Sequence, residues 1–176
     1  PEHFILAGFS LGGYVARAIY EAFPERTAAM ILIATSLRED SAEEKKSRLM
    51  AANAMTSREF RGLSTMAIRK SLHTDLATDA AIIEKVRQMG QRLGTEVFKT
   101  QSALSRERIT LKTVSCPVYV IAAKQDRLRY PEEAEELATL TGGYLDYINN
   151  CGHLIPLEMP NELARLISKW LTQKGL

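Results

Sequence analysis

Three residues of this sequence could together carry out nucleophilic catalysis: a serine, an aspartate and a histidine, in that order along the chain. Ser10 lies in Gly-Phe-Ser-Leu-Gly, Asp126 in Ala-Lys-Gln-Asp-Arg-Leu, and His153 in Cys-Gly-His-Leu-Ile-Pro. A serine hydroxyl becomes a useful nucleophile when a base takes its proton, and a carboxylate can orient and stabilise that base. We therefore predict Ser10 as the nucleophile, His153 as the base and Asp126 as the acid that fixes the histidine tautomer.

The segment around the serine fits the pattern G-x-S-x-G and predicts a nucleophile elbow, a sharp strand-to-helix turn that exposes the serine hydroxyl. The elbow comprises Gly8, Phe9, Ser10, Leu11 and Gly12. Side chains at either glycine are expected to collide with the neighbouring strand or helix, and the turn should strain Ser10. The backbone N–H of Leu11, at the start of the helix, is expected to point toward a developing oxyanion. The alternative is an ordinary glycine-rich turn in which the serine caps the helix.

The elements that must position these residues alternate between strand and helix. Short apolar runs bounded by turn residues predict four buried strands, and apolar residues at helical spacing predict helices between them. Ser10, Asp126 and His153 each follow a predicted strand, and open parallel sheets build their sites at the carboxyl ends of strands. The strands are expected at residues 3–9, 28–34, 117–122 and 144–148, and the helices at residues 11–23, 131–140 and 160–171.

A long segment without a convincing strand separates the second strand from the third. Its apolar spacing predicts three to four amphipathic helices, with breaks near Gly62, Gly90 and Gly94. The fold class predicted is therefore α/β: a parallel sheet of about four strands with a helical insertion. The expected core covers residues 1–37 and 109–176, and the expected helical cap covers residues 38–108.

These motifs resemble the α/β-hydrolase family, in its serine-nucleophile branch of carboxylesterases and lactonases. The family has the chain order serine, acid, histidine. Asp126 resembles its acid loop, and residues 152–160 resemble its histidine segment G-H-x-x-x-x-E-x-P. The resemblance covers nearly the whole chain, with residues 38–108 in the place of the family's variable cap. It implies a serine hydrolase that cleaves a small-molecule ester, thioester or lactone through an acyl-enzyme and needs no metal or organic cofactor.

The sequence departs from the family pattern at its beginning. The family's sheet normally has eight strands with the elbow after the fifth, whereas here the elbow follows the first predicted strand. We therefore expect an N-terminally truncated member that lacks the loop with the second oxyanion donor. Losing one such donor typically costs ~10²–10³ in rate, so the chain as it stands is expected to be poorly active. The strand at residues 3–9 is expected to leave an open, adhesive edge.

Two other functions stay open beside ester hydrolysis. One is hydrolysis of a C–C bond beside a ketone by the same fold. The other is a binding or scaffold protein, or an inactive fragment. The complete set of serine, acid and base argues against the second, because a binding protein has no need of it. The family's dehalogenases and epoxide hydrolases carry an aspartate at the elbow, so Ser10 argues against both.

Composition excludes several further classes. The chain has 176 residues and a formal net charge of +2, which gives no reason to expect nucleic-acid or membrane binding. Its apolar runs stay short of the ~20 residues that a membrane helix needs. Cys116 and Cys151 lack metal-ligand spacing, and we expect a reducing, cytoplasmic location. Nothing in the sequence decides between a monomer and a homo-oligomer.

The predicted cap carries a hint about the substrate. Residues 38–108 contain 14 Lys and Arg residues against 10 Asp and Glu residues. An acidic substrate or an acyl carrier protein would suit such a surface, and a solvated helix face is the alternative. Four cap methionines could line an adaptable acyl pocket or pack in a core. The basic cluster is Arg58, Arg61, Arg69 and Lys70, and the methionines are Met50, Met55, Met66 and Met89.

Four other side chains with reactive groups are expected to have structural roles. His3 precedes the elbow and His73 lies in the helical insertion, so both are expected at the surface or in packing. Cys151 is expected to pack. Glu158 is expected to support the loop that carries the histidine.

Overall fold

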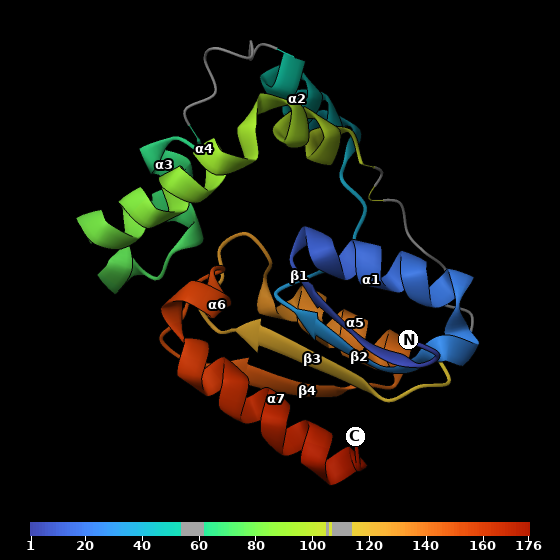
Figure 1. Ribbon diagram of the computed structural model, residues 1–176. Helices are drawn as coiled ribbons and strands as arrows, with labels where there is room; N and C mark the ends of the chain where they lie inside the picture. The colour runs from blue at the N-terminus through green and yellow to red at the C-terminus, as the bar shows by residue number, and fades with distance from the viewer. Residues whose placement is uncertain (54–61, 105, 107–113) are drawn as a thin grey trace. The chain divides into compact units, whose positions relative to one another are not determined.

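The computed structural model describes residues 1–53, 62–104, 106 and 114–176, and these form two compact units (Figure 1). The core unit consists of Pro1–Leu37, Ser71–His73 and Ile109–Leu176. The helical unit consists of Arg38–Lys70 and Thr74–Arg108. Three residues from within the predicted cap, Ser71–His73, thus group with the core.

A four-stranded parallel sheet organises the core unit and confirms the predicted fold class. The strands lie side by side in chain order, so each new strand adds to the same edge. Ile33 pairs with both Phe9 and Ile121, which aligns the carboxyl ends of three strands. The strands are β1 (Phe4–Phe9), β2 (Thr27–Ile33), β3 (Val118–Ala123) and β4 (Tyr144–Ile148).

Both faces of the sheet are covered, because alternate residues of the buried strands point to opposite sides. One face packs on α7 (Pro160–Lys174), and the other on α1 (Leu11–Ala22) and α5 (Pro131–Thr141) (Figure 1). The α7 side includes Ile31, Ile33, Tyr119, Ile121, Leu163, Leu166 and Trp170. The α1 and α5 side includes Ala16, Tyr20, Met30, Leu32, Val118, Val120, Ala134 and Leu137.

Helix α1 forms where predicted, but it does not bury the face on which helical spacing gathers Val15, Ala18, Ile19 and Ala22. Val15 is 44% exposed, and Ala18 and Ala22 are exposed as well. Gly13 and Arg17 lie on the buried face instead. The Arg17 guanidinium donates to the carbonyl oxygens of Gly13 and Ser36 at 3.4 and 2.7 Å, and its burial lowers its pKa. A buried arginine that donates to backbone carbonyls has no signature in helical periodicity, which explains the difference.

The two helices that follow β3 and β4 begin and end at residues suited to helix ends. Pro131 and Pro160 stand at their first positions, where the missing N–H costs nothing. Gly142 and Gly175 end them with φ angles of 62° and 69°. The short elements η1 (Pro24–Arg26) and α6 (Ile155–Glu158) complete the core unit.

The helical unit contains helices over most of its described residues. In chain order they are α2 (Ala42–Asn53), α3 (Thr65–Ser71), η2 (Thr74–Leu76) and α4 (Ala80–Ala103). The predicted break at Gly94 is confirmed, because its φ of 75° and ψ of 175° interrupt α4. The predicted break at Gly90 is wrong, since this glycine lies within α4. No helix in the described ranges is both long and apolar enough to span a bilayer.

Three of the four cap methionines lie in the described ranges and do not pack in a core. Met50, Met66 and Met89 are 62%, 81% and 42% exposed, so the core-packing alternative is wrong for these three. Their use as an acyl pocket stays a prediction. Met55, Arg58 and Arg61 lie outside the described residues.

Candidate active site

Ser10 occupies a one-residue turn between β1, which ends at Phe9, and α1, which begins at Leu11. Its φ of 51° and ψ of −114° are unusual for a residue with a side chain and cost about 1–3 kcal/mol. Two hydrogen bonds hold this conformation, one to Ile33 at the end of β2 and one from Thr35 just after that strand. The serine N–H donates to Ile33 O at 2.9 Å, and Thr35 Oγ1 donates to Ser10 O at 2.8 Å.

The pair of glycines at which a side chain would collide differs from the predicted pair in one member. A Cβ at Gly8 would lie 2.4 Å from the carbonyl oxygen of Gly12, so β1 and α1 approach too closely for any side chain there. A Cβ at Gly12 would meet nothing within 4 Å, and the predicted collision at this position is wrong. The second close approach is at Gly13 instead, where a Cβ would lie 2.4 Å from Thr35 Oγ1. The G-x-S-x-G pattern does not contain this residue, so the sequence reasoning missed it.

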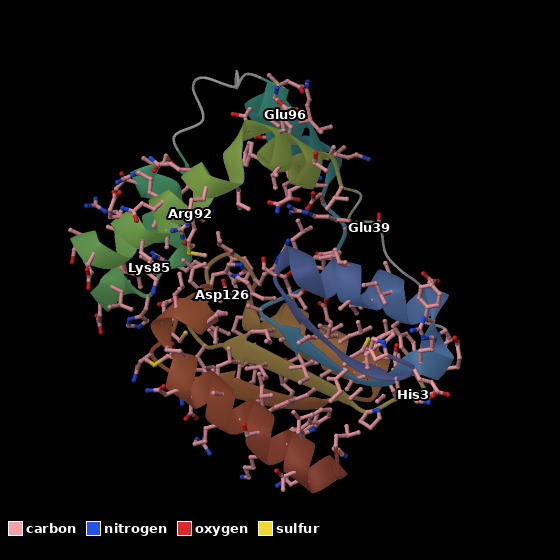
Figure 2. The ribbon with its side chains drawn as sticks, viewed as in Figure 1. His3, Glu39, Lys85, Arg92, Glu96 and Asp126 are labelled. Carbon is pink, nitrogen blue, oxygen red and sulfur yellow. The ribbon has the colours of Figure 1, made fainter. Side chains whose placement is uncertain are left out.

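Asp126 and His153 come from the loops after β3 and β4, and both are almost fully buried. Figure 2 labels Asp126, beyond the end of β3. The backbone N–H groups of Leu128 and Arg129 donate to Asp126 Oδ1 at 2.8 and 2.9 Å. The second carboxylate oxygen, Oδ2, lies 2.8 Å from His153 Nδ1. One oxygen thus fixes the carboxylate in its loop and the other faces the imidazole.

The opposite nitrogen of the imidazole faces the serine. His153 Nε2 and Ser10 Oγ are 2.9 Å apart, so the structure brings all three predicted residues into one chain of hydrogen bonds. The Phe9 ring lies against the imidazole with its centroid 5.3 Å away. A neutral imidazole that donates through Nδ1 to the carboxylate has its Nε2 lone pair free to accept the serine proton.

The acid and histidine loops also bind each other directly. Gln125 N donates to Cys151 O, and Cys151 N donates to the Gln125 side chain, both at 3.3 Å. These reciprocal bonds fix the residues next to Asp126 and near His153. The sequence offered no signal for Gln125, because its partner is 26 residues away in another loop.

Leu11 is the first residue of α1, and N–H groups of a helix's first turn have no acceptor within the helix. This N–H is adjacent to Ser10, which suits the predicted oxyanion role, and that role stays a prediction.

The other reactive side chains named from the sequence lie outside the hydrogen-bonded chain of Ser10, His153 and Asp126. His3 is exposed and precedes β1, at the end of the sheet opposite to Asp126 (Figure 2). Cys151 is fully buried, and burial raises the pKa of its thiol to about 12. The Glu158 carboxylate accepts from the backbone N–H groups of Gly152 and Leu154 at 3.1 and 3.0 Å, so it supports the histidine loop as predicted.

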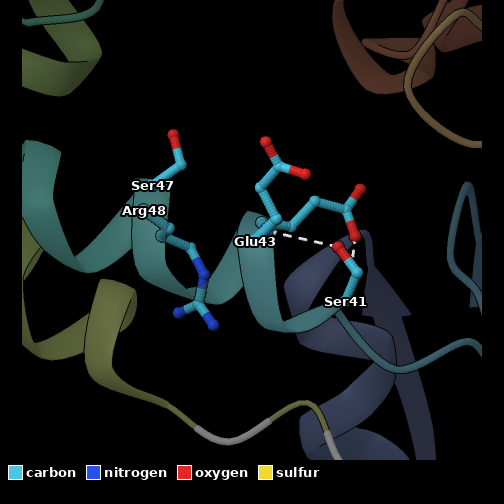
Figure 3. A pocket seen from close by; sticks show the side chains of 5 residues that line it. Ser41, Glu43, Ser47 and Arg48 are labelled. Atoms are coloured by element: carbon cyan, nitrogen blue, oxygen red, sulfur yellow. Dashed lines mark hydrogen bonds between the residues drawn. The ribbon is translucent and has the colours of Figure 1, made fainter.

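Two other features of the described residues lie apart from the candidate triad or are absent. Within these residues, no group of three or more His, Cys, Asp and Glu side chains is arranged to hold a metal ion. A shallow hollow on the helical unit has residues of α2 and its N-terminal flank as its lining (Figure 3). That lining consists of Ser41, Glu43, Glu44, Ser47 and Arg48, and none of these belongs to the candidate triad.

Comparison with known proteins identifies the class to which this fold and site belong. The chain is a member of the alpha/beta hydrolase family, which it matches over residues 1–166.

Three individual proteins show what kinds of family member this chain is similar to. A pimeloyl-[acyl-carrier protein] methyl ester esterase of Aromatoleum aromaticum is 29% identical over 187 residues, covering 95% of this chain and 73% of the relative. A thermophilic esterase from Thermogutta terrifontis, solved with malate bound, is 30% identical with a TM-score of 0.85. That match covers 98% of this chain, which spans 65% of the esterase. The enol-lactonase from Burkholderia xenovorans LB400 shares the fold, with 17% identity, a TM-score of 0.82, and coverage of 97% of this chain and 66% of the lactonase.

Proposed function

We propose that this chain carries the catalytic residues of a serine hydrolase that cleaves esters through an acyl-enzyme. The observation that supports this most is the continuous chain of hydrogen bonds from Ser10 Oγ through the His153 ring to the Asp126 carboxylate, with distances of 2.9 and 2.8 Å. The esterases among its relatives support an ester as the substrate.

In the first half of the reaction, Ser10 Oγ attacks the ester carbonyl carbon while His153 Nε2 takes the hydroxyl proton. The carbonyl oxygen becomes an oxyanion, to which the Leu11 N–H donates. Asp126 keeps the imidazole ring oriented and stabilises the positive charge that it acquires. When the intermediate collapses, the C–O bond to the alcohol breaks and His153 gives its proton to the departing oxygen. The acyl group then remains on Ser10.

In the second half, a water molecule replaces the alcohol. His153 takes a proton from the water, whose oxygen attacks the acyl carbon. Collapse of the second intermediate returns the proton to Ser10 Oγ and releases the carboxylic acid. The side chains then have their starting protonation states, so the cycle consumes water and ester only.

Chromogenic ester hydrolysis tests this proposal on the protein in its natural length. We expect turnover of a short-chain p-nitrophenyl ester, and a decrease of at least about 10³-fold in Ser10→Ala, because the acyl-enzyme can no longer form. Lys174→Ala, near the C-terminus of α7, serves as a control for handling and folding. Equal turnover by the wild type and Ser10→Ala would contradict the proposal.

An acyl carrier protein is the partner that we propose for this activity. The relative from A. aromaticum is named for a carrier-protein-linked methyl ester, and acyl carrier proteins are acidic partners that a basic surface would suit. Arg69 and Lys70 are exposed in the last turn of α3. Charge reversal at both should weaken hydrolysis of a carrier-linked ester and leave hydrolysis of a small p-nitrophenyl ester unaffected. Equal loss of both activities would exclude carrier docking at Arg69 and Lys70.

A cytoplasmic location stays a prediction, with which the free thiols of Cys116 and Cys151 agree.

A further inference from the structure

The segment Ser71–His73 is the part of the predicted cap that belongs to the core unit. It connects α3 to η2, so the chain enters it from the helical unit and returns to that unit afterwards. Leu72 is fully buried and Ser71 is 6% exposed. A buried connection of this kind needs partners for its backbone polar groups.

The backbone of each of these three residues has a hydrogen-bond partner in the acid loop, in the histidine loop or in α6. The N–H of His153 itself donates to Ser71 O at 2.8 Å. Arg127, next to Asp126 in the chain, donates through Nη2 to Leu72 O at 3.0 Å. The N–H of His73 donates to Glu158 Oε2 at 2.8 Å. The segment is therefore bound from both the acid loop and the histidine loop.

The Glu158 carboxylate connects the histidine loop to the segment Ser71–His73. Its Oε2 accepts from both His73 N and Gly152 N, and its Oε1 accepts from Leu154 N. The N–H groups on either side of His153 and one from the connecting segment thus bind a single carboxylate. Hydrogen bonds to an ionised acceptor are roughly twice as strong as neutral ones, so Glu158 should fix the loop firmly.

Close packing shows that the contact is tight. A Cβ at Gly152 would lie 2.4 Å from His73 N and 2.5 Å from the Leu72 carbonyl carbon. The histidine loop and the connecting segment therefore meet backbone to backbone, at a residue where only glycine fits.

We propose that Glu158 and the segment Ser71–His73 form a clasp that positions the His153 imidazole between Asp126 and Ser10. This inference rests on the proposed function and deepens it. Glu158, Arg127 and the segment act through His153, so they are positioning residues. A segment that lies between two helices of the helical unit in the chain, but within the core unit in space, would then contribute to the geometry of the base.

The proposal predicts a selective kinetic effect. Without the carboxylate, two backbone N–H groups of the histidine loop and one of the segment Ser71–His73 lose their acceptor. A misplacement of about 1 Å at a reacting group can cost ~10² in rate. We expect Glu158→Ala to lower kcat and the rate of fluorophosphonate labelling by about 10- to 100-fold per folded molecule, with KM changed less than about twofold. Glu158→Gln keeps one acceptor oxygen and should recover part of the loss.

The experiment compares these variants with Glu162→Gln, which removes a charge from an exposed pair on α7 with Arg165. The labelled fraction at completion counts the competent molecules, so a loss of folding is separated from a lower rate per site. Arg127→Met is the second variant, and it keeps the test available if Glu158→Ala does not fold. Arg127 is exposed and donates to Leu72 O, so its loss should slow labelling severalfold. Arg165→Met is its control.

The outcomes separate the clasp from the function on which it rests. Slower labelling per site in Glu158→Gln and Arg127→Met, with both controls at the wild-type rate, supports the clasp. Wild-type rates per site in both variants would overturn it and leave the serine hydrolase proposal intact. A wild type that does not label at all would overturn the proposed function and the role of the clasp with it.

Discussion

At the scale of residues, Gly8 and Gly12 make a matched pair within the elbow. A Cβ at Gly8 would penetrate the backbone of α1, whereas one at Gly12 would meet open space. We expect Gly8→Ala to destabilise the fold by about 1–3 kcal/mol, since neither β1 nor α1 can move freely away. Gly12→Ala should change the free energy of unfolding by less than about 1 kcal/mol. Denaturant unfolding measures both, and equal destabilisation by the two would contradict this description of the turn.

Cys151 is a second residue whose environment makes a clear prediction. Burial, with Glu158 and Asp126 nearby, raises the pKa of its thiol to about 12. The thiolate is the reactive form, and a raised pKa lowers its fraction at pH 8 by about three orders of magnitude relative to a free cysteine. We expect little alkylation of Cys151 in the folded protein at pH 8 and rapid alkylation in denaturant, followed by peptide mass spectrometry. Rapid alkylation of the native protein would contradict this.

The candidate triad could be predicted from sequence because each member follows an apolar run that could be recognised as a strand. The contacts that hold the triad could not. Thr35 supports Ser10, and Gln125 binds the Cys151 backbone, through pairings between separate loops. Such pairings depend on the final placement of the loops and leave no periodic signal in the sequence.

At the scale of elements, an ion cluster holds the two ends of the helical unit together. Arg48 of α2 donates to Asp40 Oδ2 at 2.7 Å and to Ser102 O near the end of α4, and Arg106 approaches Asp40 Oδ1 at 3.4 Å. Asp40→Ala would leave two partly buried guanidinium groups without this carboxylate, at a cost of about 1–3 kcal/mol. We expect faster amide hydrogen exchange in α2 and the last turns of α4.

Glu84→Ala is the control for this element-scale prediction. It removes a carboxylate from an exposed i,i+3 pair with Arg87, and such pairs contribute about 0–1 kcal/mol. Exchange in α2 unchanged by Asp40→Ala, or changed equally by Glu84→Ala, would show that the cluster does not stabilise the unit.

Element boundaries in the core unit followed the sequence closely, because buried parallel strands are continuous apolar runs bounded by turn residues. The buried face of α1, in contrast, could not be predicted from its apolar spacing. Gly13 and Ala16 let this helix lie close to the sheet, and buried Arg17 satisfies backbone carbonyls, while apolar Val15 faces outward. In α4, Gly94 breaks the helix and Gly90 does not, although both have the same intrinsic preference.

At the scale of the whole molecule, one edge of the sheet is exposed to association. Among the described residues β1 pairs with β2 alone, and Ile5 is 38% exposed on it. Val15 and Phe23, at α1, are each 44% exposed. Exposed strand edges with apolar side chains tend to pair with other chains, so we expect these 176 residues alone to self-associate at micromolar to millimolar concentration.

Sedimentation velocity over a range of concentrations measures this association. Ile5→Lys should weaken it, because a lysine on an edge strand opposes pairing. Leu140→Lys, at an exposed position of α5 that is 40% accessible, should not. A wild-type chain that stays monomeric, or equal effects of the two substitutions, would contradict an adhesive β1 edge.

The account depends most on Ser10 being a nucleophile that His153 activates, and covalent labelling tests this directly. The protein is treated with a fluorophosphonate, digested, and analysed by peptide mass spectrometry. We predict one phosphonyl adduct, on Ser10, which is absent from Ser10→Ala and forms far more slowly in His153→Ala. An unlabelled wild-type protein, or an adduct on another residue that persists in Ser10→Ala, would contradict the central claim.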